Sequence, residues 1–366
     1  MYDLTKHYNH NKKEILTKIN LVLSKGILEL GSEVDKFEKN FSKYCNSKYC
    51  VTVSSGSMGL LLAVKSLNLT NTDEIITVAN SDIPTSHAIT LSGAKIVWVD
   101  VENDSFNIDP QEIIKKINKN TKAILPVHLF GNPCKMDEIC KIAKKNKLKI
   151  IEDACLSAGA SYQNKKIGSI GDITVFSTNP GKILDGIGHG GIITTNNKKT
   201  YLKLKQLRDY GRSKRPSQWS TKSEIIGYNS KLSEIDAAIL NIRLKYLDWY
   251  VEKRNINAEI YKDILNSKKI KFQSVYNNAN SAWRNFPIRV KNRNYIYNSL
   301  YKKNLNVKLN YLPPNHQDDC YLHLGEKIKL PITELICSEI INLPCHPYIS
   351  KNEIENISNN IINLLK

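Results

Sequence analysis

One lysine and one aspartate in this sequence are placed where they can do chemistry together. Lys182 lies in FSTNPGKILDGIGHGG, where an apolar run is followed by a tight turn and a glycine-rich segment. Asp153 ends the earlier apolar run KIIED. A lysine amine can hold the aldehyde of pyridoxal phosphate (PLP) as a Schiff base, and a carboxylate can keep the pyridine nitrogen protonated. The pair favours an aminotransferase.

Each of these two residues also has an ordinary interpretation. The chain has 53 Lys and Arg and 35 Asp and Glu residues, and most such side chains are solvated at a protein surface. A structural cap is the alternative for Asp153. Its neighbour Glu152 is also acidic, and alternation along a strand sends the two in opposite directions, so one of them should face a pocket. The assignment of these two residues to a cofactor site therefore depends on the elements that surround them.

Short apolar runs recur from about residue 50 to 196, with helical patterns between several of them, such as SMGLLLAVKSLN and MDEICKIAKKNK. The runs are YCVTVSS, EIITVA, KIVWVDV, KAILPVH, KIIEDA, ITVFSTN and GGIITTN. Because they show no polar alternation, we expect strands covered on both faces, in a mostly parallel central sheet flanked by helices. The fold class is therefore α/β, with ligands at the carboxyl ends of strands.

A second domain is expected beyond this sheet. The helical pattern SEIDAAILNIRLKYLDWYVEKRNINAEIYKDIL is followed by shorter strands and by Asn-rich and Pro-marked stretches. We expect a large cofactor-binding domain over residues 1–245 and a smaller C-terminal α+β domain over residues 246–366. The first ~25 residues are expected to pack on the small domain or on a partner subunit.

The segment SSGSMGLLLA places small residues where a strand meets a helix. Backbone N–H groups and the positive end of a helix can hold a phosphate there. Gly56 lets the backbone approach a ligand, Ser57 offers a hydroxyl, and Met58 follows in the same turn. Ser177, just before the lysine turn, offers a second hydroxyl. An N-capped helix and a strand-end serine are the alternatives.

Further candidates lie in the second half of the chain. Asn229, in GYNSKLSEIDAAIL, can hydrogen-bond an anion, although a capping role in this turn is equally open. Lys231 in the same turn and Tyr311 in NYLPPNH are assigned to the substrate. His316 and His346 lie in Pro-marked loops, where a substrate contact and a structural histidine are both open. Of these two, His316 is assigned to the substrate.

Composition restricts the remaining classes of protein. A net charge of +18 suggests nucleic acid, but the basic residues are spread along the whole chain, so we expect no nucleic-acid partner. The segment MYDLTKHYNHNKKEIL lacks the apolar core of a signal peptide, and no stretch of about 18 apolar residues occurs, so we expect a cytoplasmic protein without membrane contact. The eight cysteines form no CxxC pair and no Cys/His spacing, which indicates reduced thiols and no metal site.

Taken together, these segments resemble the DegT/StrS family of PLP-dependent nucleotide-sugar aminotransferases. The resemblance covers nearly the whole chain, in the order LELGSEVDKFEKNF, VSSGSMGLLLAV, FNIDPQEI, KAILPVHLFGNPCKMDEI, IEDACLSAGASY, GSIGDITVFSTNPGKIL, GGIITTN, GYNSKLSEIDAAI and NLPCHPYIS. It implies a PLP-transferase fold of type I, with PLP as cofactor and pyridoxamine phosphate as intermediate.

The resemblance also implies roles for particular residues. Lys182 would hold the cofactor, Asp153 would contact the pyridine nitrogen, and the glycine and serines named above would bind the phosphate. Asn229 would reach that phosphate from the neighbouring subunit, so the two active sites of a homodimer would be shared. L-glutamate would donate the amine, and a nucleotide-linked keto-deoxysugar would accept it.

Four positions depart from the family's pattern. Asp82, in ANSDIPTSHAI, stands where an aromatic residue usually stacks on the pyridine ring, and Leu156 stands where Gln or His usually approaches the ring hydroxyl. Both are still counted among the cofactor-binding positions. Asp185 and His189 replace residues that are commonly Gly and Asp. We therefore predict weaker cofactor retention than in a member with the aromatic residue.

The tripeptide Pro-Gly-Lys ending at Lys182 is similar to that of family members that aminate the sugar 3-position. It favours a dTDP-linked 3-keto-6-deoxyhexose, with a 4-keto sugar next, in the synthesis of an amino sugar for a surface polysaccharide such as lipopolysaccharide. The family's dehydratases carry histidine in place of this lysine, so transamination is favoured. A PLP-dependent sugar dehydratase, a cyclitol aminotransferase and a non-enzymatic regulatory protein of the same fold are the alternatives.

Overall fold

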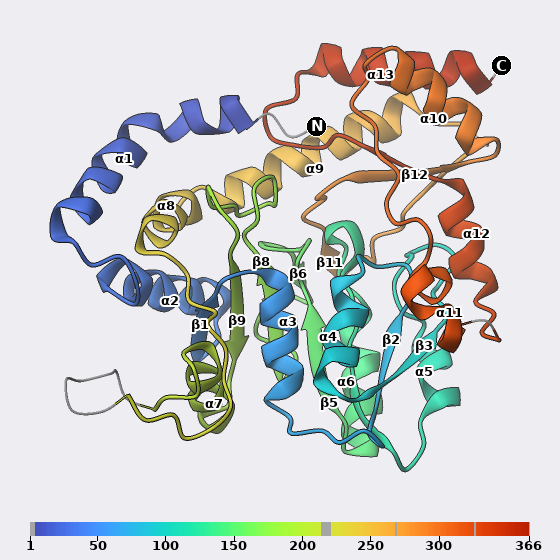
Figure 1. The fold of residues 1–366 in the computed structure, drawn as a ribbon. Coiled ribbons are helices and arrows are strands. Elements are labelled where there is room, and N and C mark those ends of the chain that lie inside the picture. Colours follow the sequence, from blue (N-terminus) through green and yellow to red (C-terminus); the bar gives the residue numbers. More distant parts are fainter. Residues whose placement is uncertain (1–3, 214–220, 268, 326, 366) are drawn as a thin grey trace.

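A seven-stranded sheet forms the centre of the chain, of which the computed structural model describes residues 4–213, 221–267, 269–325 and 327–365 (Figure 1). The strand order is β1-β9-β8-β5-β4-β2-β3. β9 runs antiparallel to both of its neighbours, and the other neighbouring pairs are parallel. The bounds are β1 (Tyr49–Val53), β2 (Glu74–Val78), β3 (Lys95–Val99), β4 (Thr121–Ile124), β5 (Lys149–Asp153), β8 (Ile173–Ser177) and β9 (Gly191–Thr195). The predicted α/β class and its seven strands are confirmed.

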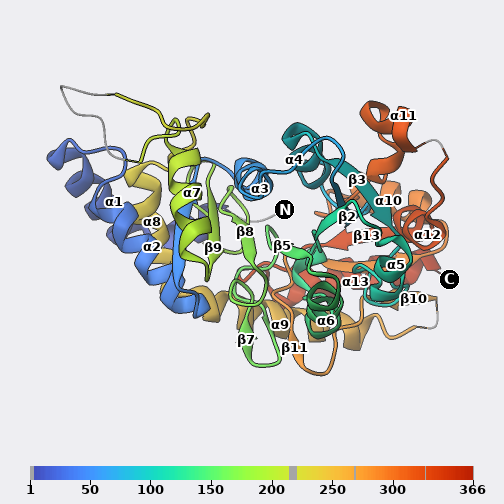
Figure 2. The ribbon, with the colours of Figure 1, turned by 90° about the horizontal axis from the view of Figure 1, so that it is seen from below.

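Helices cover both faces of this sheet, which explains its apolar strands. Figure 2 shows α3 (Gly56–Lys65) and α4 (Pro84–Ser92) on one face and α6 (Met136–Asn146) on the other, where α5 (Pro110–Lys116) packs beside α6. All five residues of β8 are buried, as expected for a strand covered on both sides. At the β1 edge lie α2 (Ser32–Cys45) and α7 (Lys198–Arg208).

A second, smaller antiparallel sheet has its own hydrophobic cluster. It consists of β10 (Ile270–Phe272), β12 (Phe286–Val290) and β13 (Ile340–Leu343). Around it lie α10 (Arg293–Lys302), α12 (Pro331–Glu339) and α13 (Lys351–Leu365), whereas α11 (Leu322–Gly325) follows Tyr321, which packs on Trp98 of β3. A third sheet joins β11 (Ala279–Asn280) to β6 (Ser161–Tyr162) and β7 (Lys165–Lys166).

The long helical pattern expected between the two sheets is divided into two helices. Two residues separate the end of α8 (Glu234–Leu244) from the start of α9 (Leu247–Ile264). α9 then passes from one core to the other: Tyr250 belongs to the cluster of the large sheet, and Tyr261 belongs to that of the small sheet. We propose that the domains divide at this junction, close to the expected boundary at residue 245.

The first helix, α1 (Leu4–Lys25), lies mainly on α8, where Ile15 packs with Ile239 and Ile242. Its first turn reaches further, because the ring of His7 lies 5.5 Å from that of Tyr348 in the C-terminal part of the chain. Within the described ranges, no helix is long and apolar enough to cross a membrane.

Candidate active site

A cavity of about 220 Å³ opens where β1, β5 and β8 end. These three strands point the same way, so the residues that follow them meet at one edge of the sheet. The sequence-predicted residues that line the cavity are Gly56, Ser57, Asp82, Asp153, Leu156, Ser177, Lys182 and Tyr311. The edge of the sheet therefore brings most of the predicted site together.

Lys182 is held by a tight turn after β8. Its backbone N–H donates to the carbonyl of Asn179 at 3.0 Å, and Gly181 between them has φ +82, a conformation that favours glycine. Burial lowers the pKa of the Lys182 amine, and the positive charge of Arg284 acts in the same direction. The amine is therefore neutral at a lower pH than that of a surface lysine, as a nucleophilic lysine requires.

Asp153 is fixed at the end of β5 by two donors. Its Oδ2 accepts a hydrogen bond from Thr85 Oγ1 at 2.7 Å, and its Oδ1 accepts one from the backbone N–H of Cys155 at 3.1 Å. Glu152 faces away from the cavity and lies 2.9 Å from His128 Nε2. The alternation of the strand thus leaves Asp153 as the carboxylate that faces the cavity.

The start of α3 forms a cradle suited to an anion. Ser55 caps the helix by accepting a hydrogen bond from the N–H of Met58 at 3.1 Å, which leaves the amides of Gly56 and Ser57 at the open end. A Cβ on Gly56 would lie only 2.7 Å from Ser177 Cβ. Glycine is therefore needed here to bring the two strand ends together, and the Ser177 hydroxyl lies beside the free end of the helix.

The residues present fit PLP. The cofactor needs donors for its phosphate, an amine for its aldehyde and a carboxylate for its pyridine nitrogen, and all three lie in this cavity. Asn179 adds an independent observation, because this residue lines the cavity and its Oδ1 is buried without a hydrogen-bond partner among the described residues. A bound molecule with a hydrogen-bond donor would satisfy this oxygen.

The positions that depart from the family's pattern differ in how exposed their side chains are. Asp82 and His189 are exposed side chains at the cavity, whereas Leu156 is a buried part of its wall. Tyr311 is the aromatic side chain in the lining, and its ring lies parallel to that of Phe130, with centroids 6.2 Å apart. The rim is therefore polar, and the wall beneath it is apolar and aromatic.

Met58 and His316 were expected at the site but do not line this cavity. Met58 is half-buried, and only its backbone takes part in the cap of α3. His316 is buried, with its Nε2 3.1 Å from Glu334 Oε1. This pairing favours the structural interpretation of that histidine, and a substrate contact there stays a prediction.

Asn229 and Lys231 also lie away from the cavity of their own chain. Asn229 is exposed. The Lys231 amine forms ion pairs with Glu29 at 3.2 Å and Asp209 at 3.5 Å. Their predicted roles therefore require a second subunit.

Sequence reasoning missed Thr85 and Asn179. Thr85 lies in the first turn of α4, and no spacing in the sequence relates it to Asp153, so only the fold reveals the pair. Asn179 stands three residues before Lys182 in a motif already singled out, and that position was the available signal.

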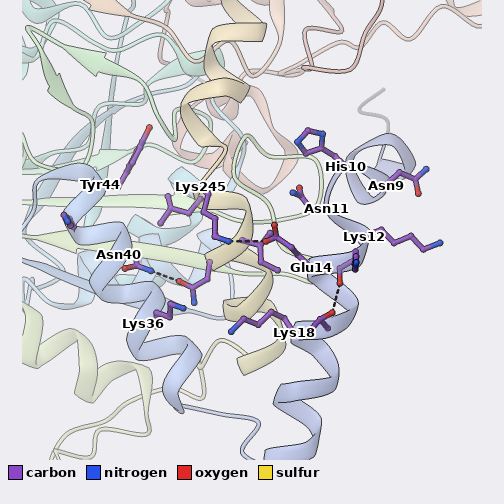
Figure 3. Close-up of a pocket in the computed structure, with 16 residues that line it drawn as sticks. Asn9, His10, Asn11, Lys12, Glu14, Lys18, Lys36, Asn40, Tyr44 and Lys245 are labelled. Atoms are coloured by element: carbon purple, nitrogen blue, oxygen red, sulfur yellow. Dashed lines mark hydrogen bonds and ion pairs between the residues drawn. The ribbon is translucent and has the colours of Figure 1, made fainter.

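A larger hollow of about 940 Å³ lies elsewhere, between α1 and α2 over α8 (Figure 3). It contains none of the predicted site residues. Two of its lysines are ion-paired, Lys18 with Glu33 at 2.9 Å and Lys245 with Glu14 at 3.2 Å. Its basic residues are Lys12, Lys13, Lys18, Lys36, Lys43 and Lys245. Because most of the predicted site residues line the smaller cavity and none lines this hollow, we assign the chemistry to the smaller cavity.

Known proteins share this fold over its whole length. Residues 9–362 match the DegT/DnrJ/EryC1/StrS aminotransferase family. A relative from Aneurinibacillus thermoaerophilus, named dTDP-3-amino-3,6-dideoxy-alpha-D-galactopyranose transaminase, is 38% identical over 346 residues, 94% of each chain. The structure of S. venezuelae DesV with a ketimine intermediate superposes with a TM-score of 0.95 at 30% identity, covering 100% of this chain and 97% of that one. NtdA from Bacillus subtilis, with bound cofactor PMP, gives a TM-score of 0.90 at 30% identity, covering 98% and 82%.

Proposed function

Because the chain belongs to the DegT/DnrJ/EryC1/StrS aminotransferase family, we propose that it uses PLP to transfer an amino group from L-glutamate to a nucleotide-linked keto-6-deoxysugar. The predicted family, fold and enzyme class are confirmed by this match. The observation that carries the proposal is the convergence of Lys182 and Asp153 on one cavity beside the open end of α3.

Each part of the cavity has a task in holding PLP. The amides of Gly56 and Ser57 and the hydroxyl of Ser177 bind the phosphate, at the positive end of α3. Asp153, held in one orientation by Thr85, keeps a proton on the pyridine nitrogen. When bound, PLP supplies a ring that accepts electrons from the carbon carrying the nitrogen.

Lys182 then has two functions. Its amine, whose pKa is lowered by burial, would be the nucleophile that joins the cofactor aldehyde. The same amine would also be the base positioned to move a proton between the carbon of the amino donor and the cofactor. Histidine, in contrast, cannot form the covalent link through a primary amine. The lysine therefore favours transamination over dehydration.

The substrate class is proposed from the relative in Aneurinibacillus thermoaerophilus, whose name specifies a dTDP-linked sugar aminated at the 3-position. We place the sugar against the polar rim formed by Asp82 and His189, and beside Tyr311. A dTDP-3-keto-6-deoxyhexose is the first substrate to test, and a 4-keto isomer is the second. The product would serve the synthesis of a surface polysaccharide.

A homodimer with shared active sites completes this proposal. Asn229 and Lys231 lie outside the cavity of their own chain, and exposed apolar side chains lie near them and on α1. Ile226 is 91% exposed, Leu23 on α1 is 52% exposed, and Ile27, two residues beyond the end of α1, is 56% exposed. Such exposed apolar side chains favour a protein interface. The eight cysteines are all free, in keeping with the cytoplasmic location that we expect.

The first experiment is the half-reaction with the amino donor. The protein is purified with PLP, its visible spectrum is recorded, and L-glutamate is added. We expect the visible band to be replaced by that of pyridoxamine phosphate, and Lys182→Ala to lack the initial band. The dTDP-keto sugars then follow, with mass spectrometry of the product. A loaded protein that ignores glutamate would contradict the proposal and favour a dehydratase or another donor.

A further inference from the structure

Asp185 is a buried carboxylate directly behind the lysine turn. It is fully buried, with a side-chain exposure of 0%. Its Oδ2 accepts a hydrogen bond from the backbone N–H of Gly181 at 2.9 Å. That N–H belongs to the peptide between Pro180 and Gly181, so the carboxylate holds the backbone one residue before Lys182.

The other oxygen of Asp185 is anchored to α8. Arg243 donates to its Oδ1 at 2.8 Å, and the same guanidinium nitrogen donates to the carbonyls of Asp185 at 2.7 Å and Gly186 at 3.1 Å. A buried ion pair with this many hydrogen bonds is geometrically restricted. Asp185 is thus a fixed acceptor.

The first helix reaches the same carboxylate. His7 of α1 is fully buried, and its Nε2 lies 3.3 Å from Asp185 Oδ1. Its ring also lies 5.2 Å from that of Tyr250 in α9. Three segments far apart in the sequence, α1, α8 and the lysine turn, therefore meet at one side chain.

We propose that Asp185 is a positioning residue, which fixes the peptide of Gly181 so that the Lys182 amine projects into the cofactor cavity. A trans peptide is planar, so holding this N–H fixes the position of the Gly181 Cα, from which the chain continues to Lys182. Gly181 has φ +82, and glycine would otherwise allow several backbone conformations here. This inference rests on the proposed function, because it takes Lys182 as the residue that joins the cofactor.

The first test measures how fast Lys182 joins PLP, independently of turnover. The Lys182 amine bonds to the aldehyde carbon, water leaves, and borohydride reduces the resulting C=N bond to a secondary amine that mass spectrometry locates. Asp185→Asn is of equal size but keeps only one accepting oxygen, so its NH2 group must face either the Gly181 N–H or Arg243, and the charged Arg243 competes for the oxygen. Because misplacing a reacting group slows its reaction, we expect trapping at Lys182 to slow by about 10-fold or more.

Asp236→Asn is the matched control. Asp236 also lies in α8, and its Oδ1 accepts from the N–H groups of Ile187 and Gly188, each at 3.0 Å. It therefore holds the same glycine-rich segment beyond the lysine turn. We expect this variant to trap PLP within about 2-fold of the unmodified rate, since the Gly181 peptide keeps its acceptor. Equal trapping rates in Asp185→Asn and the unmodified protein would overturn the inference.

Hydrogen exchange keeps the inference testable if Asp185→Asn does not fold. In the unmodified protein without cofactor, the Gly181 amide should exchange at least about 100-fold more slowly than an unstructured amide. Exchange at the unstructured rate would overturn the inference and leave the proposed function untouched. If the unmodified protein gives no trapped product at Lys182, the proposed function fails and the inference fails with it.

Discussion

Replacing Gly56 by alanine tests the phosphate cradle most directly. The new Cβ would lie 2.7 Å from Ser177 Cβ and 3.1 Å from Cys155 Sγ. Carbon atoms pack at about 3.5–4.0 Å, so a strand end must move by about 1 Å. Such overpacking costs about 1–3 kcal/mol of stability. Displacing one donor from a charged phosphate costs a further ~1.5–3 kcal/mol of binding, a loss of about 10-fold to 150-fold in PLP affinity.

The assay is a PLP titration followed by absorbance, with unfolding measured on the protein without cofactor. Gly59→Ala is the matched control. Gly59 lies in the same helix as Gly56 but on its core side, where a new Cβ would lie 2.7 Å from Val175 Cγ1. We expect both variants to lose stability and only Gly56→Ala to lose PLP affinity. An unchanged PLP dissociation constant in Gly56→Ala, or an equal loss of PLP affinity in Gly59→Ala, would refute phosphate binding at the start of α3.

Three further results are expected. Asp153→Asn keeps an acceptor for Thr85 but loses the negative charge, so PLP should still bind while the rate of the glutamate half-reaction falls by roughly 100-fold to 10,000-fold, measured by stopped-flow absorbance. In the protein without cofactor, Lys182 should react with an acylating reagent at lower pH than surface lysines do, because burial lowers its pKa; peptide mapping across pH checks this. Burial, with the charge of Arg243 next, lowers the pKa of His7 to about 2. In the unfolded chain the pKa of this histidine is ~6.5, so below that pH the unfolded chain binds a proton that the folded chain does not. The free energy of unfolding should therefore fall by up to ~1.4 kcal/mol per pH unit as the pH drops below ~6.5. Denaturant unfolding at pH 7 and pH 5 should show this loss in the unmodified protein and a smaller one in His7→Gln.

Local patterns predicted the parts of the site that lie on single elements. Apolar runs without polar alternation located all seven strands, and strand alternation was enough to separate Asp153 from Glu152. What the sequence could not supply were distances between elements. Thr85 meets Asp153 across 68 positions of the chain, and α8 ends near residue 245 although the apolar spacing continues into α9. Both depend on tertiary packing, which leaves no mark in a local pattern.

The positions that depart from the family's pattern belong to two different physical environments. Asp82 and His189 are exposed at the rim, where a side chain can change its contacts with a substrate at little cost to the fold. Asp185 is buried, and a carboxylate there is tolerable only because Arg243 and the Gly181 N–H satisfy it. A glycine in its place would leave the Arg243 charge without that partner in the interior. Substitutions at the rim should therefore alter which sugar is accepted, whereas those at Asp185 should alter the reactivity of the lysine toward every substrate alike.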